Sequence, residues 1–261
     1  MRALVTGASS GIGESFARAL RARGERLVLV ARRADRLARL AAELGGEDVA
    51  LPVSLDLARP DAAESLSRTL QARGIGVRLL VNNAGVGYGG RVHEQAPERQ
   101  RAMIDLDVRA LVDLTRAFVP AMVERGQGTV LNVVSMSAFQ PVPFLAVYAA
   151  SKAFVLSLTE SMAVELEGTG VTVQALCPGN IPTEFQAVAG TSDVKFSRTP
   201  ATTPREVVEA SLAALEKRQL VVIPGLRDRI TVSAQRFVPR AWVRRAAGEL
   251  FRPPTGGGAR A

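Results

Sequence analysis

Two residues in the second half of the chain, Tyr148 and Lys152, are spaced for acid–base chemistry. They stand four positions apart in a helical pattern, so both side chains lie on one face of that helix. A free tyrosine has a pKa near ~10, too high for acid–base catalysis at neutral pH, and a nearby ammonium lowers it by stabilising the phenolate. The chain has only two tyrosines and three lysines, so chance rarely produces this spacing. The alternative is an aromatic side chain packed beside a surface lysine.

A hydroxyl group that could serve this pair belongs to Ser135, which ends an apolar run thirteen positions before Tyr148. A hydroxyl at the end of a strand can hold a substrate oxygen while the charge on that oxygen changes. Ser137 lies close enough in the chain to be mistaken for it. Ser135, Tyr148 and Lys152 are therefore the candidate catalytic group.

A glycine-rich turn near the start of the chain follows a short apolar run and precedes a helical pattern. Backbone N–H groups at such a turn point outward at the positive end of a helix dipole, where a phosphate binds. Gly7 permits the tight turn, Gly11 lets the backbone approach a pyrophosphate, and Gly13 lets the helix pack close to the sheet. The predicted binding residues of the turn are Thr6, Gly7, Ser9, Ser10, Gly11, Ile12 and Gly13. The alternative is a glycine-rich turn without a ligand.

The elements that position these residues alternate between apolar, strand-like runs and helical patterns. We expect strands at residues 3–5, 26–31, 49–53, 77–81, 129–134, 171–176 and 220–223. We expect helices after the glycine turn, after residue 33, and over residues 60–73, 97–124 and 148–167. The alternation predicts an α/β fold in one domain, residues 1–251, with a mostly parallel sheet covered on both faces. Residues 252–261 have the composition of a flexible tail.

Polar residues follow the predicted strands, and parallel strands end at the same edge of a sheet, where a dinucleotide binds. After the second strand a carboxylate would bind the ribose hydroxyls and select NAD, but Ala31 stands there. Arg32 and Arg33 could pair with a 2′-phosphate, so we predict NADP rather than NAD. Because arginine is common in this chain, the missing carboxylate is the stronger indication.

Other polar segments extend the predicted dinucleotide site along the same edge. Asp56 is expected to accept a hydrogen bond from the adenine amino group, and the alternative is a charge that stabilises a helix N-terminus. The remaining predicted binding residues are Leu57, Asn83, Ala84, Gly85, Pro178, Gly179, Ile181 and Thr183, together with Tyr148 and Lys152.

The composition fits one large domain in a reducing compartment. The chain has 261 residues, 47% of them hydrophobic, and its only cysteine, Cys177, allows no internal disulfide. We find no signal-peptide pattern and no membrane-spanning apolar run, so we expect a cytoplasmic protein. His93 is the only histidine, which excludes a multi-histidine zinc site, and we predict no metal. The G-x-S-x-G motif of serine hydrolases does not occur.

The formal net charge of +8 is concentrated near the C-terminus, where residues 227–261 hold eight arginines against two acidic residues. A nucleic-acid-binding protein more often carries a basic groove interleaved with aromatic residues, which we do not find, so we expect no nucleic-acid partner. Arg236, Arg240 and Arg244 recur every fourth residue beside Trp242 and predict a basic amphipathic helix over about residues 230–251. Such a helix either packs over a pocket or a neighbouring subunit, or lies on an anionic membrane. We favour packing and expect a homodimer or homotetramer.

Taken together, four motifs resemble those of the short-chain dehydrogenase/reductase family: Thr6-Gly-x-x-x-Gly-x-Gly13, Asn82-Asn-Ala-Gly85, Ser135 and Tyr148-x-x-x-Lys152. The resemblance extends from about residue 3 to residue 185, or further if residues 220–223 form the last strand. It implies a single Rossmann-type domain, a doubly wound parallel sheet of about seven strands with helices on both faces. It also implies hydride transfer between a nicotinamide and a carbonyl or alcohol carbon.

The resemblance assigns roles to individual residues. Tyr148 would be the general acid for reduction and the general base for oxidation, and Lys152 would hold the nicotinamide ribose and lower the Tyr148 pKa. Ser135 would orient the substrate oxygen, and Thr183 would contact the nicotinamide end. The segment 83–85 would line the adenosine side and brace the central strand.

One candidate catalytic position departs from the family. Asp107 stands where the family usually has an asparagine that helps to hold a water linking the lysine to solvent. An ionised aspartate accepts hydrogen bonds but cannot donate them, and it could pair with Lys152 and weaken its effect on Tyr148. The proton relay is therefore the part of the implied mechanism that this residue affects.

Apolar residues near the catalytic group suggest a lipophilic ketone, aldehyde or secondary alcohol as substrate. The segment 139–145 would form one pocket wall, followed by Phe185 and Val188, and the polar run 189–203 would form a mobile lid. Both segments could instead be ordinary loop filling. Two rival functions stay open: a non-catalytic NADP sensor or scaffold of the same fold, and a peripheral membrane protein that uses the basic C-terminal helix.

Overall fold

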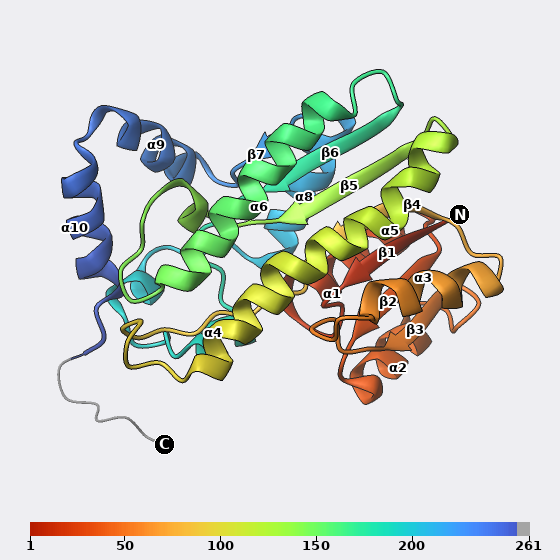
Figure 1. Cartoon of the computed structure of the whole chain (residues 1–261), viewed down its shortest axis with the longest axis horizontal. Helices are drawn as coiled ribbons and strands as arrows, with labels where there is room; N and C mark the ends of the chain where they lie inside the picture. The colour runs from red at the N-terminus through yellow and green to blue at the C-terminus, as the bar shows by residue number, and fades with distance from the viewer. Residues whose placement is uncertain (255–261) are drawn as a thin grey trace.

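The computed structural model describes residues 1–254, and its centre is a seven-stranded sheet (Figure 1). The strands are β1 (Arg2–Thr6), β2 (Leu27–Ala31), β3 (Ala50–Ser54), β4 (Val77–Asn82), β5 (Gly128–Val133), β6 (Val171–Leu176) and β7 (Val221–Val222). Their order is β3-β2-β1-β4-β5-β6-β7, and every neighbouring pair is parallel. The predicted α/β fold with a doubly wound parallel sheet of seven strands is confirmed.

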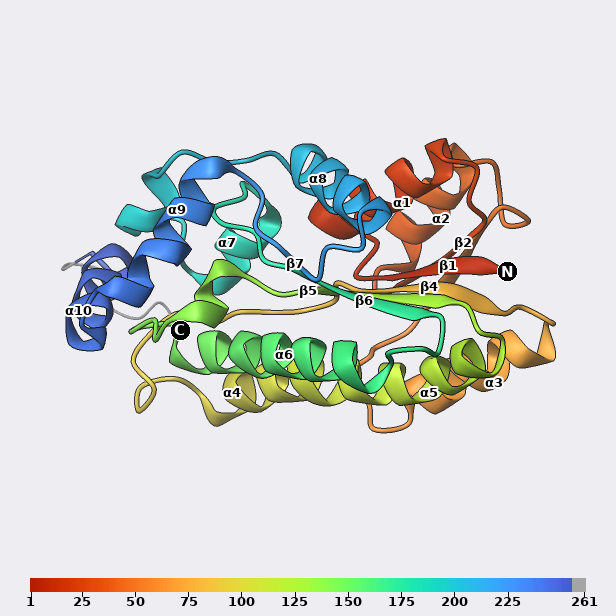
Figure 2. The same cartoon turned by 90° about the horizontal axis from the view of Figure 1, so that it is seen from above.

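Helices cover both faces of this sheet (Figure 2). One face carries α1 (Gly11–Ala22), α2 (Ala34–Glu43) and α8 (Pro204–Glu216); the other carries α3 (Ala62–Ala72), α4 (Pro97–Ile104), α5 (Ala110–Glu124) and α6 (Ala146–Glu165). Alternate residues of each strand serve the two faces: Ala3 and Val5 pack with the α1 side, and Leu4 packs with the α5 side. The strands are therefore buried on both faces, which is why they are almost continuously apolar.

The strand order reverses between β1 and β4. The strands β2 and β3 extend the sheet on one side of β1, and β4 to β7 extend it on the other side. The loops after these two strands consequently leave on opposite faces of the sheet and open a crevice at its carboxyl edge. Most of the residues predicted for the site follow the ends of β1, β2, β4, β5 and β6, so the topology brings them to this one crevice.

The helix predicted over residues 97–124 is present without a break, but it is not α-helical throughout. Its middle turn, Asp105–Arg109 (η1), is a π-helix between α4 and α5. A π-helical turn holds an extra residue and rotates the following face, and such turns occur often at functional sites. Asp107 lies in this turn and is buried.

The single basic helix predicted over about residues 230–251 is wrong. The structure has two helices instead, α9 (Leu226–Ala234) and α10 (Arg240–Phe251), separated by the 3₁₀ turn Gln235–Phe237. Pro239 explains the break, since a proline disfavours helical backbone in the residue before it and suits the start of a helix. We call residues 226–251 the C-terminal arm. Of the predicted flexible tail, 252–261, residues 255–261 lie outside the described part.

The segment after β6 contains α7 (Glu184–Ala189) and the 3₁₀ turn Lys195–Arg198, so the run predicted as a lid, residues 189–203, is only partly irregular. Thr203 and Glu206 then form a capping box that begins α8. Among the described residues, no helix is both long and apolar enough to cross a membrane.

Candidate active site

The glycine turn between β1 and α1 has the geometry that the sequence predicts. Gly7 and Gly11 have φ values of 64° and 57°, a backbone region that favours glycine. A Cβ atom on Gly13 would overlap the carbonyl oxygen of Gly7 and the side-chain amide of Asn83. These glycines therefore let the turn pack closely against Asn83 and leave its backbone without side chains at the N-terminus of a twelve-residue helix.

Thr6 and Asn83 join this turn to the neighbouring strand. The Thr6 hydroxyl donates to the carbonyl oxygen of Val81 over 3.1 Å and accepts from the backbone N–H groups of Asn83 and Ala84, each over 2.9 Å. The Asn83 amide donates to the Thr6 carbonyl oxygen over 2.8 Å. The segment after β4 is thus braced against the glycine turn, which agrees with the bracing role that the resemblance implies.

A cleft of about 400 Å³ runs from the glycine turn to the N-terminal half of α6. Of all the residues predicted for the site, only Thr6, Gly13 and Asp107 do not line it. Thr6 and Gly13 contribute from beneath, by holding the turn in place. Residues that the sequence scatters over positions 7–183 therefore face one continuous space.

At one end of the cleft, α6 carries Tyr148 and Lys152, both less than a tenth exposed. The Lys152 ammonium donates to the carbonyl oxygen of Val133 at the end of β5, over 3.1 Å, and lies 5.6 Å from the centroid of the Tyr148 ring. Ser135 follows the same strand, and its hydroxyl accepts from the backbone N–H of Ser137 over 3.1 Å. The backbone of Ser137 thus positions the Ser135 hydroxyl, and the Ser135 side chain hydrogen-bonds with Tyr148.

The pKa of Tyr148 moves in the direction opposite to the one expected from the Tyr–Lys spacing. Burial raises this pKa first, the nearby Asp107 carboxylate raises it further, and a hydrogen bond with the Ser135 side chain acts the other way. The expected lowering of this pKa by Lys152 does not prevail against burial. Within the protein alone, Tyr148 is therefore a protonated acid.

Asp107 lies behind Lys152 with a fully buried carboxyl group. One carboxyl oxygen accepts from the backbone N–H of Val86 over 2.8 Å, and the other lies 3.9 Å from the Lys152 ammonium and 3.5 Å from the Ser151 hydroxyl. Burial raises the pKa of Asp107 to about 6, although Lys152, Val86 and Ser151 all favour its ionised form. The pairing with Lys152 that the sequence allowed is present, as a long ion pair.

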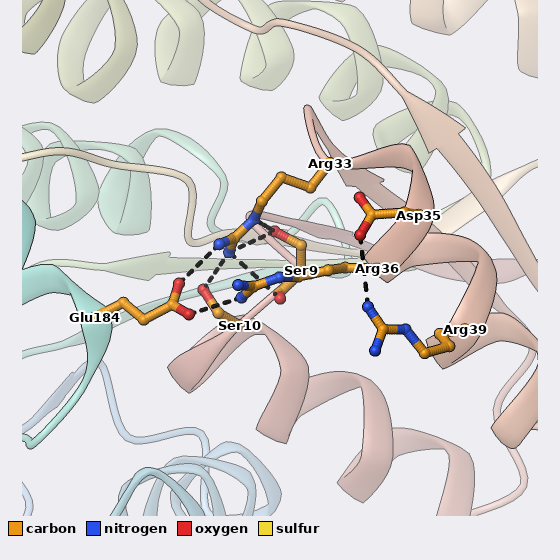
Figure 3. A network of polar contacts seen from close by, with 7 residues as sticks. All are labelled: Ser9, Ser10, Arg33, Asp35, Arg36, Arg39 and Glu184. Atoms are coloured by element: carbon orange, nitrogen blue, oxygen red, sulfur yellow. Dashed lines mark hydrogen bonds and ion pairs between the residues drawn. The ribbon is translucent and has the colours of Figure 1, made fainter.

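At the opposite end of the cleft, Arg33 reaches back to the glycine turn (Figure 3). Its guanidinium donates to the hydroxyls of Ser9 and Ser10, with a shortest distance of 2.8 Å, and pairs with Glu184 over 2.8 Å. Arg36 pairs with the same carboxylate over 2.7 Å. Sequence reasoning missed Arg36, which the helical spacing from Arg33 could have suggested, and Glu184, which lies 151 positions from Arg33 and gave no signal.

Two further predictions for this end have mixed outcomes. Arg32 lines the cleft but is exposed, and its backbone carbonyl accepts from the Ser54 hydroxyl. Asp56 also lines the cleft, and its carboxylate accepts from the backbone N–H of Ala58 over 3.1 Å, which shapes the turn before α3. One of its oxygens therefore already has a local structural role.

The substrate end of the cleft is apolar. Phe185 contacts Tyr148 with ring centroids 5.2 Å apart, and Phe196 stacks on Phe251 at 4.6 Å. Phe185 and Val188 line the cleft as predicted. Of the apolar residues predicted as a wall within 139–145, only Leu145 does so; Phe139, for example, packs into the core beside β5 instead.

Phe251 is a lining residue that sequence reasoning did not single out for the pocket. It comes from α10, so the C-terminal arm packs over the substrate end, in agreement with the favoured prediction for this segment. His93 lies away from the cleft with an exposed side chain. Within residues 1–254, no three histidine, cysteine, aspartate or glutamate side chains gather in a way that could hold a metal ion.

Comparison with known proteins agrees with this geometry. A family model described as short chain dehydrogenase matches residues 1–193. The chain is 38% identical over 188 residues to a short chain dehydrogenase of Pseudocercospora fijiensis, which covers 71% of this chain and only 61% of the fungal protein. It is 36% identical over 217 residues to the NADP-dependent 3-hydroxy acid dehydrogenase YdfG of Escherichia coli K12, covering 80% of this chain and 87% of YdfG.

A solved structure shows the same fold over nearly the whole length. The short-chain dehydrogenase from Sphingobium yanoikuyae in complex with NADPH superimposes with a TM-score of 0.80 at 33% identity, covering 99% of this chain and 98% of the other. The chain belongs to the short-chain dehydrogenase family, whose members are oxidoreductases acting on alcohol and carbonyl groups.

Proposed function

We propose that this protein is an NADP-dependent oxidoreductase that interconverts a carbonyl and an alcohol on a lipophilic substrate. The observation that carries the proposal is the single cleft that joins the glycine turn to Ser135, Tyr148 and Lys152. The relatives support the choice of cofactor, since one is named NADP-dependent and another was solved with NADPH. Arg32 and Arg33 after β2, where NAD-binding proteins of this fold carry a carboxylate, support it independently.

The residues present fit a dinucleotide. The backbone of Gly7 and Gly11, which lines the cleft at the N-terminus of α1, would hold the pyrophosphate. Arg33 with Ser9 and Ser10 would hold the 2′-phosphate, and Asp56 and Leu57 the adenine, while residues 83–85 line the adenosine side. Pro178, Gly179, Ile181 and Thr183 would border the nicotinamide end. When bound, NADP supplies or accepts the hydride at its nicotinamide ring.

The chain's own residues supply the proton chemistry. In reduction the Tyr148 hydroxyl donates its proton to the substrate oxygen, and in oxidation the Tyr148 phenolate takes that proton back. The Ser135 hydroxyl donates a hydrogen bond to the same oxygen while its charge changes. Lys152 holds the cofactor's ribose, and its ammonium stabilises the Tyr148 phenolate when this forms. The raised pKa of Tyr148 favours its acid form, which suits reduction.

The decisive variant is Tyr148→Phe, which keeps the ring packed against Phe185 and removes only the hydroxyl. We expect turnover to fall by at least about a hundredfold while NADPH binding, followed by calorimetry, stays within about twofold of wild type. Turnover close to wild type would refute the catalytic role. A wild-type protein that binds NADPH and turns over no carbonyl in a broad panel would support the alternative of a non-catalytic sensor.

The apolar substrate end favours neutral, lipophilic substrates. Leu145, Phe185, Phe196 and Phe251 line it, whereas the lining cations among the described residues, Arg32, Arg33 and Lys152, belong to the cofactor side. The similarity to YdfG favours a second candidate, a 3-hydroxy acid. The two candidates can be separated by measuring kcat/KM for aryl and alkyl ketones and for 3-keto acids of matched size. A higher kcat/KM for the charged 3-keto acids would exclude lipophilic compounds as the substrate class.

The C-terminal arm supports a proposal about assembly. Phe237 and Trp242 are 89% and 68% exposed, although Phe251 of the same arm is buried at the pocket. We infer that the exposed part of the arm packs against a second subunit of a homodimer or homotetramer, in a cytoplasmic protein. Sedimentation of the wild type and of Trp242→Ala tests this, and a monomer that instead binds anionic vesicles would support the membrane alternative.

A further inference from the structure

Glu184 connects the segment after β6 with the region after β2 (Figure 3). It is the first residue of α7, in the segment that follows β6. Its two carboxylate oxygens pair with different arginines, Arg33 over 2.8 Å and Arg36 over 2.7 Å, and both arginines belong to the region after β2. We call these three side chains the Glu184 clasp.

The clasp lies directly over the glycine turn. Arg33 donates to the hydroxyls of Ser9 and Ser10 while it holds Glu184, so the clasp continues into the turn itself. The neighbour of Glu184 also touches the turn: a Cβ atom on Gly11 would lie 3.3 Å from the Thr183 side chain. The start of α7 thus forms one side of the space that a dinucleotide must enter.

The chemistry of this corner is that of an anion site. Two guanidinium groups and two serine hydroxyls converge on it, and all of them are hydrogen-bond donors suited to a phosphate. The carboxylate of Glu184 already accepts hydrogen bonds from both guanidinium groups. Hydrogen bonds from Arg36 and Arg33 lower the pKa of Glu184 to about 2, so it is ionised at every working pH.

A phosphate and this carboxylate therefore compete for the same donors. The 2′-phosphate carries more charge and more acceptor oxygens than a carboxylate, so it can displace Glu184, and the two anions would repel each other if both stayed. NAD has a hydroxyl at this position, which offers no comparable replacement for the lost ion pairs. Glu184 therefore competes with the 2′-phosphate of NADP and does not compete with NAD.

We propose that Glu184 is a selectivity-determining residue for the cofactor: its carboxylate occupies the Arg33–Arg36 site that the 2′-phosphate of NADP takes, and the phosphate displaces it on binding. The inference rests on the proposed function, because it takes the adenosine end of NADP to lie at Arg33. It adds two residues, Glu184 and Arg36, to those that decide between NADP and NAD. Glu184 weakens the preference for NADP, and Arg36 strengthens it.

Displacement of Glu184 has a consequence at the other end of the cleft. The next residue, Phe185, packs against the Tyr148 ring and lines the substrate side. Glu184 and Phe185 are adjacent at the start of α7, so release of the clasp would act on the segment that carries Phe185.

The test uses 2′,5′-ADP and 5′-ADP, which contain the adenosine end with and without the 2′-phosphate and cannot react. In calorimetry we expect Glu184→Gln to bind 2′,5′-ADP about three- to tenfold more tightly than wild type, because two exposed ion pairs no longer compete. Binding of 5′-ADP should change by less than about twofold. The matched control is Asp35→Asn, which removes the same charge from a pair with Arg39 on the same helix as Arg36 but makes no contact with α7.

A second variant tests the other half of the clasp. Arg36→Ala should weaken 2′,5′-ADP severalfold and leave 5′-ADP unchanged, since it removes a phosphate donor. An unaltered ratio of the two affinities in Glu184→Gln, or an equal gain in Asp35→Asn, overturns the clasp while leaving the proposed function intact. A wild type that binds both fragments equally overturns the 2′-phosphate site itself and the clasp with it.

Discussion

Asp107 is the residue at which this chain departs most clearly from its family. Its carboxyl group is fully buried, and it accepts from the Val86 backbone while lying 3.9 Å from the Lys152 ammonium. Burying a carboxylate is costly unless it is well paired, and one backbone donor with a hydroxyl and an ammonium at longer distances is a modest compensation. The same charge raises the pKa of Tyr148, so Asp107 acts through space on the tyrosine that we propose as the general acid.

We predict that Asp107→Asn keeps or raises activity. The amide oxygen can still accept from Val86, while the loss of the negative charge removes a contribution that raises the Tyr148 pKa and frees Lys152 from its ion pair. The pH profile of kcat should shift its basic limb to lower pH. A large loss of activity with normal folding would mean that the aspartate has a role of its own.

The same variant makes a separate prediction about stability. Burial raises the pKa of Asp107 from 3.8 to about 6, so between these values the folded chain keeps a proton that the unfolded chain has released. Stability from this group therefore falls as pH rises through that window and stays low above it. Calorimetry should show Asp107→Asn raising Tm at about pH 8 by several degrees and much less at about pH 4. Asp105→Asn, two positions away and half exposed, is the control, and equal shifts at both pH values would contradict the prediction.

At the scale of elements, two local irregularities place the chemistry. The π-helical turn between α4 and α5 carries Asp107 into the interior, and the glycine turn between β1 and α1 opens the backbone toward the cleft. Neither works alone: Thr6 and Asn83 lock the glycine turn to the end of β4, and Val86, just after that strand, binds Asp107. The end of β4 is thus the link between the cofactor side and the catalytic side.

Gly13→Ala tests the glycine turn as an element. A Cβ atom there would overlap the Gly7 carbonyl and the Asn83 amide, both of which are held by other bonds, so the turn must distort. We expect a loss of about 1–3 kcal/mol in the free energy of unfolding and weaker binding of 5′-ADP. Gly248→Ala is the matched helical control, because its Cβ would meet only the Pro143 side chain at 3.4 Å. If Gly248→Ala caused the same loss, the cause would be the replacement of a helical glycine and not the close approach of Gly13 to Gly7 and Asn83.

At the scale of the whole molecule, the C-terminal arm completes the pocket that the sheet begins. The proposed catalytic groups follow β5 and lie on α6, but Phe251, which lines the same cleft, comes from the last helix. Figure 1 shows α9 and α10 at the edge of the molecule, beyond the carboxyl ends of the strands. The arm holds six arginines against Asp228 and Glu249, so it carries half of the net charge of +8.

Phe251→Ala should therefore affect substrate and spare cofactor. The ring stacks on Phe196 and lines the substrate end, so its removal should raise KM for bulky ketones severalfold, with little change for the smallest substrates. NADPH affinity, measured by calorimetry, should stay the same. Leu250→Ala, at the exposed neighbouring position, is the control. A parallel loss of NADPH binding would mean that the arm supports the whole cleft and not the substrate end alone.

Sequence reasoning reached the sheet and its crevice because both follow from short-range patterns. Apolar runs of strand length, helical periodicity and the glycine spacing predict parallel strands with a dinucleotide turn, and the strand ends then meet at one edge. It was less successful where a single residue interrupts a pattern. Pro239 divides the expected C-terminal helix, and the π-helical turn at Asp105–Arg109 leaves no sign in the periodicity.

By itself, the order of residues determined the fold class and the glycine turn, and it singled out Ser135, Tyr148 and Lys152 as candidates, since these depend on patterns and spacings along the chain. Only the tertiary structure decided which charges meet: Glu184 with Arg33 and Arg36, and Asp107 with Lys152. It also decided that Tyr148 is an acid of raised pKa, because that value depends on burial and on a carboxylate from another helix. Electrostatic interactions act through space, and distance along the chain carries no information about them.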